Sequence, residues 1–292
     1  MNESDLAEWR YNMSGRVVGI GRINRDDVEA NVTKTFEGGF ITSGTAISYS
    51  DSFVLREGME KNNLARKYIA FAALPDDGTV LSIERAVAIN RARTVETAAL
   101  TFNIPNDIYN GSMRTIVYSK GAISLHGGDL AREFETLEIG NYACADGKIA
   151  IASKEPLTLV RREKRQIGLK ETPETGTLYC EEISSSYNRG KRTFGRGEEI
   201  FTAHFAVAVG DGEKAKALSK SLSVYDEGNI RSVSAAGADG KRYLLIGNAG
   251  EKAVSFDIKK AYGGTAFSLD GAQRIDRVAL EAWEAALLEI KD

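Results

Sequence analysis

Residues 67–118 read KYIAFAALPDDGTVLSIERAVAINRARTVETAALTFNIPNDIYNGSMRTIVY. Apolar residues fill the runs on both sides of residues 75–78, where Pro75 fixes its φ and Gly78 can take a positive φ at no steric cost. These four residues therefore predict the turn of a β-hairpin. A second turn signal, at residues 106–111, leads into another strand with β-branched residues. Successive strands of this kind predict a broad antiparallel sheet.

The length and the amino-acid composition are those of a globular protein. A chain of 292 residues with 42% hydrophobic and 27% charged residues is long enough for one large β domain or two unequal ones. A net charge of −3 argues against a nucleic-acid partner, because phosphate binding favours a basic surface. No run reaches the roughly 18 apolar residues of a membrane span. The acidic N-terminus lacks a signal-peptide core, so we expect a cytoplasmic location, or else an excised part of a secreted enzyme.

Turn signals recur at close spacing after residue 118, and residues 154–156 are one of them. This pattern predicts an all-β fold: a large antiparallel sandwich over residues 1–222 and a small antiparallel sandwich over residues 223–292. Residues 50–52 are predicted to be a turn and residues 57–63 a loop or one helical turn. Residues 213–222 are the best helix candidate.

The C-terminal segment, residues 277–292, allows two interpretations. Its composition favours a helix, since Leu280, Trp283 and Leu287 have helical spacing. A pair of closing strands at residues 277–280 and 285–290 suits the domain better, and we predict strands. The cysteines, Cys144 and Cys180, are predicted to be half-buried thiols, and a single disulfide stays open. The sequence predicts no metal site and no cofactor.

Several segments resemble a known group of proteins. They are residues 67–118, LVRREKRQIGL at 159–169, GTLYCEEI at 176–183, RYLLIGNAGEKAVSFDI at 242–258 and RVALEAWEAALLEI at 277–290. In pattern these look like the β-sandwich regions that accompany catalytic domains in bacterial polysaccharide lyases and glycoside hydrolases. The resemblance implies a larger sandwich of the supersandwich type and a small closing sandwich. It transfers no catalytic residues to this chain.

Candidate catalytic residues are few. His126 lies in a turn, where an imidazole can act as a base. Glu84 and Glu181 lie in apolar strands and could supply the carboxylates of a glycosidase, but the favoured interpretation of each is an outward-facing strand residue. His204 is predicted to be a core or cross-strand residue.

A carbohydrate-binding surface is the more plausible site. Sugar recognition combines an aromatic ring with planar amide, carboxylate and guanidinium groups. One loop and its following strand hold these residue types: Asn106, Asp107, Tyr109, Asn110 and Arg114. Turn geometry alone is the competing explanation for the asparagines and the aspartate.

Three functions stay open. The first is a carbohydrate-associated β-sandwich unit of a polysaccharide-degrading enzyme, with an oligo- or polysaccharide as ligand and a catalytic domain or partner chain beside it. The second is a carbohydrate-active enzyme in its own right: a glycoside hydrolase, a polysaccharide lyase or a mutarotase-like epimerase. The third is a structural or assembly module without a ligand.

Overall fold

The computed structural model describes residues 10–12, 16–19, 24–54, 58–75, 78–99, 101–106, 114–125, 136–164 and 178–291. Within these ranges every paired strand runs antiparallel to its neighbour, and strands far outnumber helices. The predicted all-β, sandwich-like fold is thereby confirmed. No helix in the described part of the chain is long and apolar enough to span a membrane.

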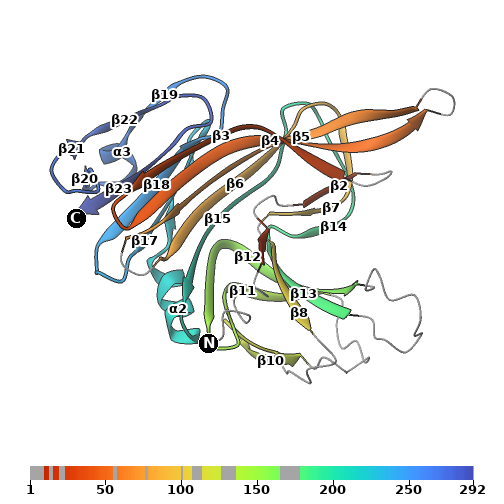
Figure 1. The fold of residues 1–292 in the computed structure, drawn as a ribbon, viewed down its shortest axis with the longest axis horizontal. Coiled ribbons are helices and arrows are strands. Elements are labelled where there is room, and N and C mark those ends of the chain that lie inside the picture. The colour runs from red at the N-terminus through yellow and green to blue at the C-terminus, as the bar shows by residue number, and fades with distance from the viewer. Residues whose placement is uncertain are drawn as a thin grey trace.

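The largest layer is a sheet of twelve strands, counted over the described ranges, with nine of them in the order β1-β8-β13-β12-β15-β6-β5-β4-β3 (Figure 1). Strand β11 also pairs with β12, and β9 and β10 continue the sheet from β11, because β9 pairs with β11 and β10 pairs with β9. The strands are β1 (Arg10–Asn12), β3 (Asn24–Phe36), β4 (Gly39–Val54), β5 (Gly58–Ala73), β6 (Val80–Ala88), β8 (Thr101–Asn106), β9 (Arg114–Tyr118), β10 (Gly121–Leu125), β11 (Thr136–Ala145), β12 (Ile149–Lys164), β13 (Leu178–Ser185) and β15 (Glu199–Val209).

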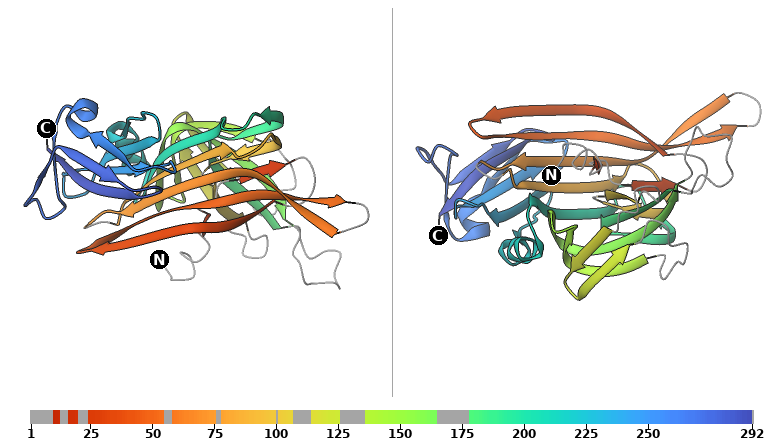
Figure 2. Two further views of the ribbon diagram at one scale, coloured as in Figure 1. Left: turned by 90° about the horizontal axis from the view of Figure 1, so that it is seen from above. Right: turned by 60° about the horizontal axis from the view of Figure 1, so that its bottom comes forward.

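Smaller layers pack against this sheet. A three-stranded sheet contains β2 (Arg16–Gly19), β7 (Ala92–Ala98) and β14 (Asn188–Phe194). The C-terminal region forms a six-stranded sheet of β16 (Ser223–Val224), β17 (Ile230–Ala236), β18 (Arg242–Asn248), β20 (Thr265–Phe267), β21 (Arg274–Ile275) and β23 (Ala285–Lys291). Strands β19 (Val254–Asp257) and β22 (Arg277–Leu280) pair with each other. In Figure 2 these C-terminal strands, drawn in blue, lie at one end of the long strands.

The predicted hairpin forms between β5 and β6. The pairing runs from Ala65 opposite Ala88 to Ala73 opposite Val80, and Gly78 has a φ of 65° in the turn. The prediction of a turn at residues 50–52 and of a loop or helical turn at residues 57–63 is wrong for residues 50–52 and 58–63, because β4 and β5 continue their ladder there; Glu57 lies outside the described residues. Pairing with a long neighbouring strand outweighs the polar composition that suggested a turn and a loop.

The predicted turn at residues 154–156 is also wrong. Strand β12 runs through these residues, but it pairs with β15 up to Ser153 and with β13 from Leu157 onward. The ladder to β11 shifts its register over the same stretch. Pro156 cannot donate a ladder hydrogen bond, so the irregularity falls where the strand changes partners.

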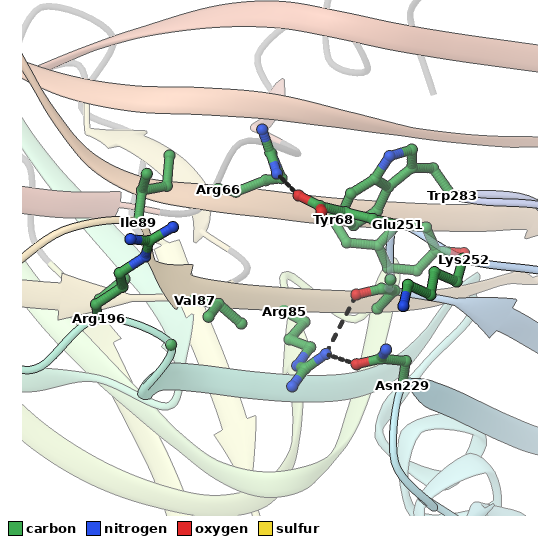
Figure 3. Close-up of a pocket in the computed structure, with 14 residues that line it drawn as sticks. Arg66, Tyr68, Arg85, Val87, Ile89, Arg196, Asn229, Glu251, Lys252 and Trp283 are labelled. Carbon is green, nitrogen blue, oxygen red and sulfur yellow. Dashed lines mark hydrogen bonds and ion pairs between the residues drawn. The ribbon is translucent and has the colours of Figure 1, made fainter.

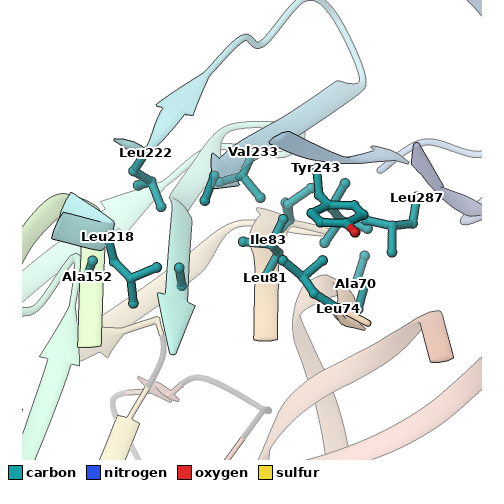
Figure 4. Close-up of a cluster of buried hydrophobic side chains, with 14 of the residues drawn as sticks. Ala70, Leu74, Leu81, Ile83, Ala152, Leu218, Leu222, Val233, Tyr243 and Leu287 are labelled. Atoms are coloured by element: carbon teal, nitrogen blue, oxygen red, sulfur yellow. The ribbon is translucent and has the colours of Figure 1, made fainter. Parts of the chain in front are cut away.

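One hydrophobic cluster joins the large sheet to the C-terminal sheet (Figure 4). Leu81 and Ile83 of β6 pack in it with Val233, Tyr243 and Leu287 of the C-terminal sheet. A second cluster fills the opposite side of the large sheet. Because one core contains side chains from both sides of residue 222, the division into domains 1–222 and 223–292 stays a prediction.

The helix prediction is confirmed by α2 (Gly212–Ser221), and a short helix, α3 (Ile258–Tyr262), follows β19. The side chain of Asp211 caps α2 by accepting hydrogen bonds from the backbone N–H groups of Glu213 and Lys214. Ala215 and Leu218 are buried on the inner face of the helix. The tail forms strands β22 and β23, as predicted, rather than a helix.

We expect Asp211→Ala to lower the free energy of unfolding by about 1 kcal/mol, because two backbone N–H groups lose their acceptor. Urea denaturation of the purified protein measures the change. Lys216→Ala on the same helix removes no cap and should change stability by less than about 0.5 kcal/mol. Equal effects of the two substitutions would contradict a capping role for Asp211.

Candidate functional site

A cavity of about 600 Å³ lies between the large sheet and the loops of the C-terminal sheet (Figure 3). Strands β5 and β6 supply one wall through Arg66, Tyr68, Arg85 and Val87. These side chains share one face because alternate strand residues point to the same side of a sheet. The opposite wall comes from the β18–β19 loop and the turn before β23. Together the walls combine aromatic, aliphatic and cationic groups.

Trp283 is the most unusual residue of this cavity. It lies in the turn between β22 and β23 with a φ of 64°, in the left-handed region that bulky residues avoid. That conformation costs roughly 1 kcal/mol relative to an ordinary backbone, and it persists only where the surroundings determine it. A strained tryptophan in a cavity wall marks this turn as a functional candidate.

The turn is fixed by hydrogen bonds on both sides of Trp283. The backbone N–H of Glu281 donates to the Glu284 carboxylate at 2.9 Å. The carbonyl of Glu284 accepts from the backbone N–H of Asn248 at 2.8 Å and from the Tyr68 hydroxyl at 3.2 Å. Lys34 forms an ion pair with the Glu284 side chain. These bonds hold the indole in place against the backbone strain.

The indole ring lies beside two other groups of the cavity. Its centroid is 6.3 Å from that of the Tyr68 ring, and the Arg66 guanidinium lies 5.5 Å from its centroid. A cation over an indole face is attracted to the ring quadrupole. Burial, and next the nearby Glu284 carboxylate, raise the pKa of Tyr68, so its hydroxyl stays protonated. Trp283, Tyr68 and Arg66 therefore pack against one another in the wall of the cavity.

An ionic network runs from the cavity wall into the interior. Arg85 donates to Glu199 at 2.8 Å, and Arg231 donates to the same carboxylate oxygen at 2.6 Å. Arg231 also forms an ion pair with Asp226 at 3.6 Å. Burial raises the pKa of Glu199, but the hydrogen bonds and charges of Arg231 and Arg85 outweigh it and hold that pKa below its usual value. Glu199 therefore stays ionised between the two guanidinium groups.

His204 ends this network in a bridge between two carboxylates. Its Nδ1 lies 2.9 Å from Glu155 and its Nε2 lies 3.1 Å from Asp226, while its backbone N–H donates to Glu155 at 2.7 Å. Glu155 reaches the ring from the irregular segment of β12, and Asp226 lies in the turn before β17. His204 is buried, as predicted, but its neighbours are charged rather than apolar. It links the large sheet to the C-terminal sheet.

The bridge favours the imidazolium form. Burial lowers the pKa of His204, but the hydrogen bonds that its ring N–H groups donate to Asp226 and Glu155, with the charges of these carboxylates, outweigh it and raise the pKa from 6.5 to about 9. The folded protein therefore binds this proton more tightly than the unfolded chain does. The resulting stabilisation is complete below pH 6.5 and is lost as the pH rises toward about 9.

We expect the free energy of unfolding to fall by on the order of 3 kcal/mol across this pH window, because the folded state loses the His204 proton. Urea denaturation at a series of pH values measures the slope. Asp226→Asn should flatten it, since one carboxylate of the bridge is gone, while Asp276→Asn at an exposed turn should not. A slope unchanged by Asp226→Asn would contradict the assignment to His204.

Among the sequence-predicted catalytic residues, Glu84 lies in β6 on the face opposite to the cavity. Its side chain is 1% exposed, so its interpretation as an outward-facing residue is wrong. Its Oε1 atom has no hydrogen-bond partner in the described part of the chain. Burial raises the pKa of Glu84 well above 4.5, and the nearby Lys67 lowers it by less. Glu84 is thus a buried core residue whose charged form is disfavoured by burial, and it lies outside the cavity.

We expect Glu84→Gln to leave the unfolding free energy at neutral pH unchanged or to raise it, because burial disfavours the charged carboxylate and an amide of similar shape carries no charge. Glu84→Ala should lower it by about 2 kcal/mol, since it leaves a cavity in the core. Urea denaturation at pH 7 measures the unfolding free energies of both variants. Strong destabilisation by Glu84→Gln would show that the folded protein needs the carboxylate.

The other predicted site residues are described only in part, so the predicted carbohydrate-binding site stays a prediction. Asn106 ends β8, which pairs with β1 and β13, whereas Arg114 begins β9, which pairs with β10 and β11. Glu181 lies in β13 opposite Arg161 and Ile104. The predicted residues His126, Asp107, Tyr109 and Asn110 lie outside the described residues. Cys144 is a buried free thiol.

The described residues contain no cluster of three or more histidine, cysteine, aspartate or glutamate side chains suited to a metal ion. No family of known proteins matches this chain, and no curated protein resembles it in sequence. None of the residues that line the cavity was predicted from the sequence to be a site residue. The available signal was Trp283, a tryptophan placed in the turn between the two predicted closing strands.

Proposed function

We propose that this chain is a carbohydrate-associated β-sandwich unit and that a saccharide binds in the cavity between the large sheet and the C-terminal sheet. The observation that carries this proposal is the indole of Trp283, held at the cavity in a strained conformation by a fixed turn. A rigid aromatic ring packs well on the apolar face of a sugar, and it loses little conformational entropy on binding.

The lining of the cavity favours binding over hydrolysis. Glycosidases use two carboxyl groups that flank the scissile bond. Among the described residues that line the cavity, Glu251 is the single carboxylate, and it forms an ion pair with Arg66. His204 is buried between two carboxylates and does not line the cavity. We therefore favour an accessory unit of a polysaccharide-degrading enzyme over an enzyme in its own right.

We expect Trp283→Ala to weaken binding of the best ligand from a glycan array by about tenfold or more, since the stacking surface is lost. Isothermal titration calorimetry gives the dissociation constants, and a reducing-end assay on the same ligands tests for hydrolysis. Phe40→Ala, which removes an exposed aromatic ring on β4, serves as the matched control and should bind normally.

A second variant separates binding from folding. Trp283→Gly also removes the ring, but glycine adopts a positive φ without strain, so this variant should be more stable than Trp283→Ala by roughly 1 kcal/mol. Both variants should lose binding despite this difference in stability. Undiminished affinity in Trp283→Gly would reject the cavity as the saccharide site, and product formation would reject the accessory assignment.

A further inference from the structure

The cavity concentrates positive charge in a protein whose net charge is −3. Its lining includes four cationic side chains and a single carboxylate, Glu251, among the described residues. The cations are Arg66, Arg85, Arg196 and Lys252. A hollow lined by one sign of charge attracts ligands of the opposite sign more strongly than an open surface does.

Two of these cations are already bound to protein groups. Arg66 pairs with Glu29 at 3.0 Å and with Glu251. Arg85 pairs with Glu199, and its Nη1 also donates to the Asn229 side chain at 3.0 Å and the Ala249 carbonyl at 3.2 Å. These contacts fix both guanidinium groups in the wall, where they shape the cavity.

The other two cations have no ion-pair or hydrogen-bond partner for their side chains within the described residues. In Figure 3, Arg196 and Ile89 lie on one side of the cavity, and Lys252 and Trp283 lie on the other. Both are exposed, so their charges are available to a ligand. The cavity therefore presents two available cations with an aromatic ring beside one of them.

The backbone on both sides is well fixed. On the Arg196 side, the backbone N–H of Gly197 donates to the Ala88 carbonyl at 2.8 Å, and the Ala88 N–H donates to the Glu198 carbonyl at 2.9 Å. The turn that carries Arg196 is thereby tied to the end of β6. A cation with a fixed backbone loses less freedom when a ligand binds it.

On the Lys252 side, one buried amide holds two elements of the cavity. The side-chain NH₂ group of Asn248 donates to the Lys252 carbonyl and to the Glu281 carbonyl, each at 2.8 Å. Lys252 and the turn of Trp283 therefore keep a fixed spacing, because both are tied to the same residue of β18. A sugar ring on the indole would therefore bind on the side of the cavity that also holds Lys252.

We infer that the cavity takes an acidic saccharide, whose ring packs on Trp283 and whose carboxylate or sulfate groups pair with Lys252 and Arg196. This inference rests on the proposed function and adds the charge of the ligand. Arginine and lysine both suit these anions, and the guanidinium of Arg196 can bind a carboxylate or a sulfate through two N–H groups. A neutral saccharide would leave both cations without a partner.

Calorimetry with three matched oligosaccharides of equal length tests the inference: an oligogalacturonate, its carboxyl-reduced counterpart and a sulfated galacto-oligosaccharide. An acidic ligand should bind at least about tenfold more tightly than the reduced one. Added salt should weaken only the binding of the acidic ligands. The carboxylated and sulfated ligands together show which acidic group is preferred.

Arg196→Ala and Lys252→Ala should each reduce the preference for the acidic ligand by about fivefold, and the double variant should abolish it. Lys220→Ala, at an exposed lysine of α2, is the matched control and should have no effect. Equal binding of the acidic and reduced ligands would overturn the inference and leave the proposed function intact. Binding of none of the three would overturn both. Tight acidic binding that the double variant retains would overturn the assignment of the two cations.

Discussion

The bridge that His204 makes between Glu155 and Asp226 is the interaction on which the cavity depends. Its three groups come from β12, β15 and the turn before β17, so the bridge joins the large sheet to the C-terminal sheet. Removing a charged imidazolium from water costs free energy, and the cost is offset only when the charge has a close partner of opposite sign. Replacing one carboxylate leaves the buried imidazolium of His204 with a single partner. The network therefore ties the large sheet and the C-terminal sheet, which supply the two walls of the cavity, to each other.

The apolar core and the polar network have different roles in this interface. Val233, Tyr243 and Leu287 cover Leu81 and Ile83, and burial of this kind supplies most of the free energy of association between layers. Hydrophobic contact has little directional preference, so it does not by itself fix the offset between two sheets. Hydrogen-bonded charges do have directional preference, and we assign them the role of fixing that offset.

Local sequence signals predicted much of the fold. The turn at residues 75–78, helix α2 and the closing strands β22 and β23 each follow from residues close together in the chain. The site could not be predicted in the same way. His204 is separated from Glu155 by 49 positions and from Asp226 by 22, so no local pattern connects them. The turn signal at residues 154–156 also concealed Glu155, because Pro156 marks both chain reversals and strand irregularities. The residues that form the cavity meet only through the packing of two sheets.

The position of Trp283 has a spectroscopic consequence. The chain contains two tryptophans, and the other, Trp9, lies outside the described residues. The indole of Trp283 borders the cavity, beneath the guanidinium of Arg66 and beside the Tyr68 ring. Indole emission responds to the polarity and charge of its surroundings, so displacement of water from the cavity should change the wavelength and intensity of this emission. The protein therefore carries an intrinsic fluorophore at the place where a ligand would arrive, and occupancy can be followed without a label.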